Sequence, residues 1–82
     1  MLLYFEFDQR RAKAEVTWPK QGGTIIVHLT DARMVKEFPA DLYFEVDKKN
    51  KVVFTIESRD NKKLIELQNV LAKRLQEFVN KS

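Results

Sequence analysis

The sequence predicts an α+β fold: a five-stranded, mainly antiparallel sheet with one C-terminal amphipathic helix packed on one face. Between Asp60 and Lys81, apolar residues recur at the spacing of a helix. Before Asp60, short segments alternate apolar and polar residues as half-buried strands do, and turn residues separate them. A chain of 82 residues is the length of a single small domain, so we expect one domain, 1–82.

Three predicted strands lie in the N-terminal part of the chain, at Leu2–Phe7, Lys13–Trp18 and Thr24–Thr30. The stretch 8–12 is polar and is expected to form the first turn. Pro19–Gly23 contains the strongest turn signal of the chain. Keeping apolar residues on one face sets Trp18 opposite Ile25 and Phe7 opposite Ala14, because a slip by one residue would turn every side chain to the other face.

The predicted order continues with a short helix, two strands and the long helix. Ala32–Phe38 is expected to be helical, and Pro39 ends it because the residue before a proline avoids the α conformation. Leu42–Asp47 and Lys51–Ser58 are expected to form a hairpin in which Val46 faces Val52. Asn50 then falls where a short loop needs a left-handed residue. The expected N-cap of the long helix is Ser58 or Asp60. The inward strand residues are predicted to be Leu3, Phe5, Phe7, Ala14, Val16, Trp18, Ile25, Val27, Leu29, Leu42, Phe44, Val46, Val52, Phe54 and Ile56.

Composition narrows the classes of function. The chain has no cysteine, which excludes disulfides, thiolate metal sites and cysteine nucleophiles. It shows no signal-peptide pattern at its start and no apolar run of the ~20 residues that span a bilayer, so we expect a cytoplasmic protein that does not enter the membrane. The formal net charge is +3. We expect no cofactor.

The predicted registers also place side chains on the uncovered face of the sheet. One outward row would hold Glu6, Glu15 and His28, and one nitrogen with two oxygens can bind a divalent metal ion. The alternative is a solvated row in which Glu15 pairs with protonated His28. These three residues are therefore a candidate metal site, with the solvated row as the alternative.

Four apolar side chains are expected on the same uncovered face: Tyr4, Ile26, Tyr43 and Val53. A contiguous apolar patch usually marks a protein partner, whereas scattered residues of this kind are ordinary on the wet side of an antiparallel sheet. Leu42–Val46 is the preferred edge strand, because no tight turn joins it to the strand before it. An edge strand can pair with a peptide or with a second copy of the chain.

Clustered cations suggest an alternative, a nucleic-acid-binding module. Its phosphate contacts would be Arg10, Arg11, Lys48, Lys49, Lys62 and Lys63. Bases usually stack on aromatic residues, and the outward tyrosines have acidic neighbours, which disfavours this reading.

Catalytic patterns are missing from the sequence. There is no glycine-rich phosphate loop and no pair of histidines at metal-binding spacing, and His28 is the only histidine. The sequence therefore predicts a small non-enzymatic binding or adaptor domain, with a protein partner or a homodimer as the expected assembly.

Overall fold

The predicted α+β fold is confirmed by a computed structural model that describes residues 1–20, 23–55 and 59–81. Within these residues, five antiparallel strands form one sheet in the order β1-β2-β3-β4-β5. The elements are β1 (Leu2–Phe7), β2 (Arg10–Thr17), β3 (Thr24–Leu29), α1 (Met34–Glu37), β4 (Asp41–Val46), β5 (Val52–Val53) and α2 (Lys62–Lys81).

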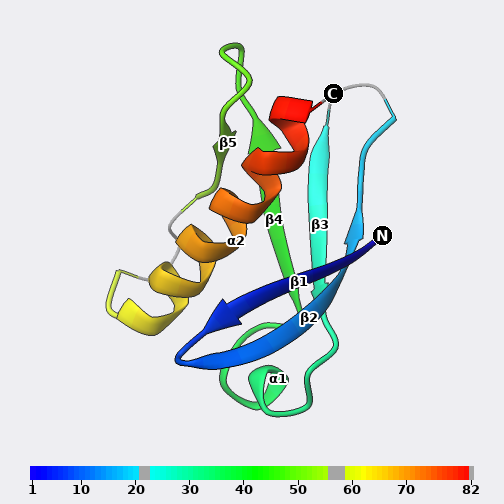
Figure 1. Ribbon diagram of the computed structural model, residues 1–82. Helices are drawn as coiled ribbons and strands as arrows, with labels where there is room; N and C mark the ends of the chain where they lie inside the picture. The colour runs from blue at the N-terminus through cyan, green and yellow to red at the C-terminus, as the bar shows by residue number, and fades with distance from the viewer. Residues whose placement is uncertain (21–22, 56–58, 82) are drawn as a thin grey trace.

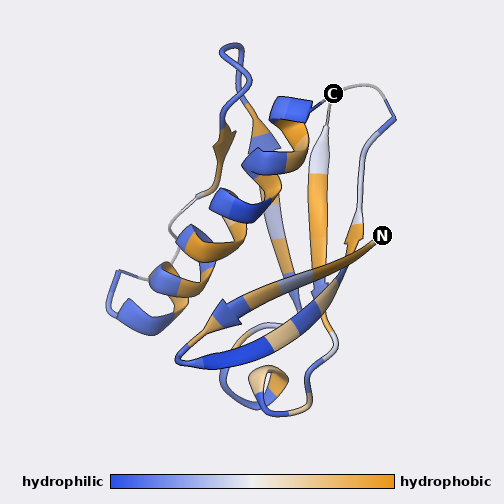
Figure 2. Ribbon diagram, viewed as in Figure 1, coloured by the Kyte–Doolittle hydropathy of each residue, from blue (hydrophilic) through white to orange (hydrophobic). Residues whose placement is uncertain are grey.

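The sheet curls around α2, so that this helix contacts both β1 and β5, the first and last strands of the sheet (Figure 1). Figure 2 shows the orange apolar side of α2 turned toward the sheet and the blue polar side turned away. The helix therefore covers the inner face of the sheet and also lies beside both of its ends.

The core lies between α2 and the inner face of the sheet. Leu67, Leu71 and Leu75 of α2 are fully buried, as the helical spacing predicts. The buried strand residues are Leu3, Phe5, Ala12, Ala14, Val16, Ile25, Val27, Leu29, Leu42 and Phe44. The predicted inward residues Phe7, Trp18, Val52 and Phe54 are partly buried and pack against this core. Met34 and Phe38 close the core at the end of the sheet next to α1.

The predicted register between the first two strands is wrong by four residues. Asp8 and Gln9 form a tight turn in which both have positive φ, 53° and 63°, so Phe7 lies opposite Arg10. A two-residue hairpin loop needs two such residues, and Asp-Gln is not the usual Asp-Gly signal. The slip is an even number, so the inward face predicted for these strands is unchanged. Ala12, which the sequence pattern places in the first turn, is instead buried in β2.

The registers of the other two predicted hairpins are confirmed. Val16 lies opposite Val27, and Ala14 lies opposite Leu29. Val46 lies opposite Val52, and Asn50 has a φ of 62°. The strand predicted over Lys51–Ser58 is shorter in the structure, because β5 contains only Val52 and Val53; residues 56–58 lie outside the described part of the chain.

Both helices begin and end within two residues of the predicted positions. Helix α1 stops before Phe38, which precedes Pro39 and is extended with a φ of −127°. The N-terminal cap of α2 is Asn61, whose Oδ1 accepts a hydrogen bond from the Leu64 amide at 3.1 Å. The prediction of Asp60 as the cap is therefore wrong, and Ser58 lies outside the described residues.

The prediction that Leu42–Val46 is an edge strand is wrong. β4 lies between β3 and β5, and the two ends of the sheet are β1 and β5. Val46, expected to face inward, is exposed. It is the last residue of β4, directly before the β4–β5 loop.

Candidate functional site

A groove of about 530 Å³ runs beside β4, where β5 has ended. It is bounded by β4, by the residues that follow β5 and by the first turns of α2. Its lining residues are Thr24, Pro39, Asp41, Leu42, Tyr43, Glu45, Val53, Phe54, Thr55, Leu64 and Gln68. We call this feature the β4 groove.

The β4 groove exists because β5 covers only part of β4. The pairing between these two strands joins Glu45 with Val53 and Val46 with Val52, and it goes no further among the described residues. Asp41 and Tyr43 lie beyond it. Within residues 1–20, 23–55 and 59–81, β4 is thus an interior strand at one end and has an uncovered side at the other.

The uncovered side presents main-chain hydrogen-bonding groups. The Leu29 amide donates to the carbonyl of Ala40 at 2.7 Å, so Ala40 directs its carbonyl toward β3. Antiparallel strands alternate in this respect, so Asp41 and Tyr43 direct their N–H and C=O groups to the other side, that of β5. The Asp47 amide, which donates to the Lys51 carbonyl at 2.9 Å, fits the same alternation. In the described part of the chain, no main-chain partner meets Asp41 or Tyr43 on that side.

Gln68 gives the groove a second polar feature. Gln68 is only 8% exposed, and it is the one polar residue that is buried among the described residues. Its amide has no hydrogen-bond partner in those residues. No described side-chain nitrogen or oxygen is both sealed from solvent and unpartnered, so this amide reaches the water of the groove. A buried amide with unused donors and acceptors is ready to bond a ligand.

The charged residues that line the groove are both acidic. Asp41 and Glu45 contribute carboxylates, and none of the lining residues that the structure describes carries a positive charge. Oδ1 of Asp41 lies 2.6 Å from Nδ1 of His28, which stands opposite it on β3. Both side chains of this pair are about half exposed, at 55% for His28 and 46% for Asp41.

Three of the four residues predicted to bind a protein partner come together here. Tyr43 and Val53 line the groove, and Ile26 lies opposite Tyr43 on the outer face of the sheet. Tyr4 does not join them, because it lies opposite Lys13 on β1, at the far end of the sheet. Tyr43 is 57% exposed and Tyr4 is 53% exposed, so the two tyrosines are similarly accessible but in different places.

The predicted row of Glu6, Glu15 and His28 is not formed. Glu6 lies opposite Arg11, and the position beside Glu15 on β1 is taken by Leu2. Glu15 does lie opposite His28. The described residues contain no cluster of three side chains suited to a metal ion, so the weak metal-site hypothesis is wrong for this set. The cause is the tight turn between β1 and β2, which shifts β1 by four residues.

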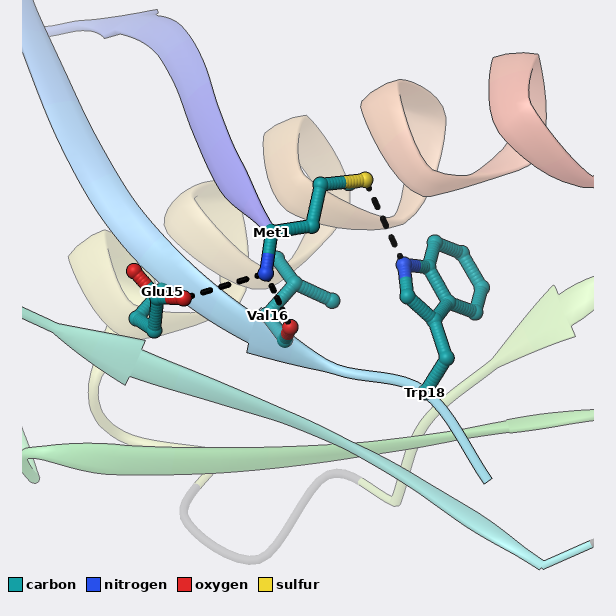
Figure 3. Close-up of polar contacts among 4 residues, drawn as sticks. All are labelled: Met1, Glu15, Val16 and Trp18. Carbon is teal, nitrogen blue, oxygen red and sulfur yellow. Dashed lines mark hydrogen bonds and ion pairs between the residues drawn. The ribbon is translucent and has the colours of Figure 1, made fainter. Parts of the chain in front are cut away.

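Figure 3 shows where the carboxylate of Glu15 is directed instead. The amino group of Met1 donates to Oε1 of Glu15 and to the carbonyl oxygen of Val16, both at 3.0 Å. The indole Nε1 of Trp18 donates to the sulfur of Met1 at 3.4 Å. These contacts hold the start of β1 against β2, and they occupy the carboxylate that the metal hypothesis required.

The six cations proposed to contact phosphate lie at two ends of the molecule. Figure 1 shows the β4–β5 loop, with Lys48 and Lys49, at the top, and the β1–β2 turn and the start of α2 at the bottom. Arg10 and Arg11 follow that turn, and Lys62 opens α2 with Lys63. The structure therefore does not gather the six into a single phosphate-binding surface.

A second groove, of about 450 Å³, lies between β1 and α2. Its lining mixes charges of both signs with one exposed tyrosine: Tyr4, Phe5, Glu6, Arg11, Val70, Lys73, Arg74 and Glu77. Arg74 is engaged within the protein, since it pairs with Glu77 and its Nε donates to the Tyr4 carbonyl at 3.0 Å. This lining is less suited to an anionic ligand than a uniformly basic groove would be.

Sequence reasoning missed Gln68 and the role of Asp41. Gln68 sits next to Leu67 in the helical period, so the pattern placed it at the border of the apolar stripe and gave no reason to single it out. Asp41 directly precedes the predicted strand Leu42–Asp47. Its position opposite His28 could have been found only from the register of β3 and β4, which no tight turn fixes.

No helix in the described residues is long and apolar enough to cross a membrane. The chain matches no protein-family model, and neither a curated protein nor a solved structure shows significant similarity to it.

Proposed function

We propose that this chain is a small non-enzymatic binding module that recognises a protein partner through the β4 groove. The observation that carries the proposal is the conjunction of unused polar groups with exposed apolar surface in one groove. In the part of the chain that the structure describes, the Gln68 amide has no partner at 8% exposure, β4 has uncovered main-chain groups, and Tyr43 is 57% exposed beside them. Apolar surface with a few convergent polar groups is the usual make-up of a binding site.

The non-enzymatic part of the proposal is supported by the surroundings of the only imidazole. His28 is 55% exposed and is held by Asp41 on an open sheet face. General bases and nucleophiles are most effective in clefts that exclude water. This open face of the sheet is not such a cleft. The lack of cysteine agrees with a reducing compartment, and we propose the cytoplasm as the location.

Site-specific cross-linking tests the proposed function. A photo-reactive amino acid replaces Thr55, which is exposed and lines the groove, and the cross-linked proteins are identified from cells that express the full chain. Each candidate is then purified, and its affinity for the chain is measured. We expect Tyr43→Ala to weaken binding of a true partner about tenfold or more, since exposed aromatic residues often carry interface energy.

Tyr4→Ala is the matched control, because Tyr4 is a tyrosine of nearly equal exposure outside the β4 groove. It should leave the affinity unchanged. A partner that is lost equally with either variant, or only with Tyr4→Ala, would place the binding surface elsewhere and contradict the proposal.

The nucleic-acid alternative is tested separately by titrating the labelled protein with a mixed-sequence oligonucleotide at low salt. Amide shifts that cluster at Arg10, Lys48 and Lys62 and vanish as salt rises would favour that alternative over the β4 groove. A flat titration would remove it.

A further inference from the structure

We propose that the occupant of the β4 groove is an extended, basic polypeptide segment that pairs with the uncovered side of β4 as an added strand. This inference rests on the proposed function and names the chemistry of its partner. Three features of the groove lead to it: the direction of the main-chain groups, the alternation of side chains along β4, and the sign of the charge.

Main-chain geometry favours an extended ligand. Tyr43 directs both its N–H and its C=O toward the groove, and Asp41 does the same two residues earlier. Residues at this spacing are met by alternate residues of a neighbouring strand, whose N–H and C=O groups fall into register with them. β5 already uses this side of β4 as far as Glu45, so an added strand would continue the line that β5 begins.

Side-chain alternation defines what the added strand would carry. Along β4, Leu42 and Phe44 point into the core, whereas Asp41 and Tyr43 lie on the outer face. An added strand follows the same alternation. Its inward residues would meet Leu42 and Leu64 beside the Gln68 amide, which favours apolar side chains there. Its outward residues would lie beside Asp41, Tyr43 and Glu45.

The acidic lining of the groove favours positively charged side chains at the outward positions of the added strand. Among the described lining residues, Asp41 and Glu45 are the only ionisable side chains other than Tyr43, and both are acidic. A lysine or arginine at the outward positions would gain from both carboxylates and from the face of Tyr43, whereas an acidic residue would be repelled. The inferred ligand therefore alternates basic and apolar residues.

Three synthetic capped peptides test this inference on the intact chain. The first alternates lysine with valine, the second alternates glutamate with valine, and the third is the lysine peptide with N-methyl groups on alternate main-chain nitrogens. Affinities are measured by calorimetry, and the site is located by amide NMR. We expect the first peptide to shift the Tyr43 and Thr55 amides and the Gln68 side-chain amide.

We expect the glutamate and N-methylated peptides to bind at least about tenfold more weakly than the lysine peptide, because one loses charge complementarity and the other loses main-chain hydrogen bonds. On the protein, Glu45→Gln should weaken the lysine peptide severalfold. Glu37→Gln is its matched control, since Glu37 is an exposed glutamate of α1 that does not line the groove, and it should have no effect.

Several results would overturn the inference. Equal binding of the lysine and N-methylated peptides would exclude an added strand, and equal binding of the lysine and glutamate peptides would exclude a basic ligand. Failure of all three peptides to bind, or groove shifts that appear with protein concentration alone and so indicate a second copy, would reject the proposed occupant. None of these results removes the proposed function, which the cross-linking experiment and its tyrosine variants decide on their own.

Discussion

Two glutamines on α2 occupy opposite situations on the side of the helix that faces β4 and β5. Gln76 lies beside β5, accepts a hydrogen bond from the Val52 amide at 2.8 Å and donates to the Asn50 carbonyl at 2.7 Å. Gln68 lies eight residues earlier, about 12 Å along the helix, and its amide has no partner among the described residues. The same side chain thus closes the sheet at one place and is unused at the other.

The difference comes from the length of β5. With only two residues, β5 offers its outer main-chain groups to Gln76 and ends before it reaches Gln68. On the opposite side of the sheet, β1 is closed in the same manner as β5, because Arg74 donates to the Tyr4 carbonyl. Uncovered strand edges invite pairing with other chains, and proteins usually protect them. This fold protects β1 and β5 with α2 and leaves the β4 groove next to β5.

The largest expected effect concerns the packing that holds α2 beside both regions. Leu71 is fully buried at the centre of the helix, so Leu71→Ala should lower the free energy of unfolding by about 2–5 kcal/mol. Denaturant unfolding measures this change. Lys73→Ala on the exposed side of the same helix is the control and should cost under ~0.5 kcal/mol. Equal losses in the two variants would contradict the assignment of the buried face.

An intermediate effect is expected at the occupied glutamine. Gln76→Leu keeps most of the side-chain volume but removes both hydrogen bonds to the β4–β5 hairpin, and it leaves the partly buried Val52 amide without its acceptor. The loss should be about 1–3 kcal/mol in denaturant unfolding, with faster hydrogen exchange at Val52. An unchanged exchange rate at Val52 would show that Gln76 does not protect β5.

The smallest expected effect is at the unused glutamine. Gln68→Leu removes an amide that forms no hydrogen bond within the described residues, so the free energy of unfolding should stay within about 0.5 kcal/mol of the original or rise. The same variant should weaken a groove ligand. A loss of stability as large as that of Gln76→Leu would mean that Gln68 has a structural role and would remove the contrast between the two residues.

For the strands, local patterning predicted which side chains face inward but not the register between β1 and β2. The alternation of Leu3 and Phe5, and of Val16 and Ala14, predicted the inward faces correctly, because burial depends on the period of two and not on the partner. It could not fix which residues face each other across β1 and β2. That was decided by the turn at Asp8 and Gln9, where neither residue is the glycine that usually indicates a tight hairpin.

By itself, the sequence determined the periodic features of this protein: the row of Leu67, Leu71 and Leu75 on α2, the inward faces of the strands and the left-handed residue at Asn50. These depend on spacing within a segment of the chain. Only the tertiary structure decided the candidate site. The β4 groove requires that β5 end at Val53, that Asp41 lie opposite His28 and that Gln68 face the gap, and each of these joins residues that are distant in the sequence. Main-chain groups left unpaired by a short neighbouring strand leave no mark in composition or periodicity, because every residue carries them.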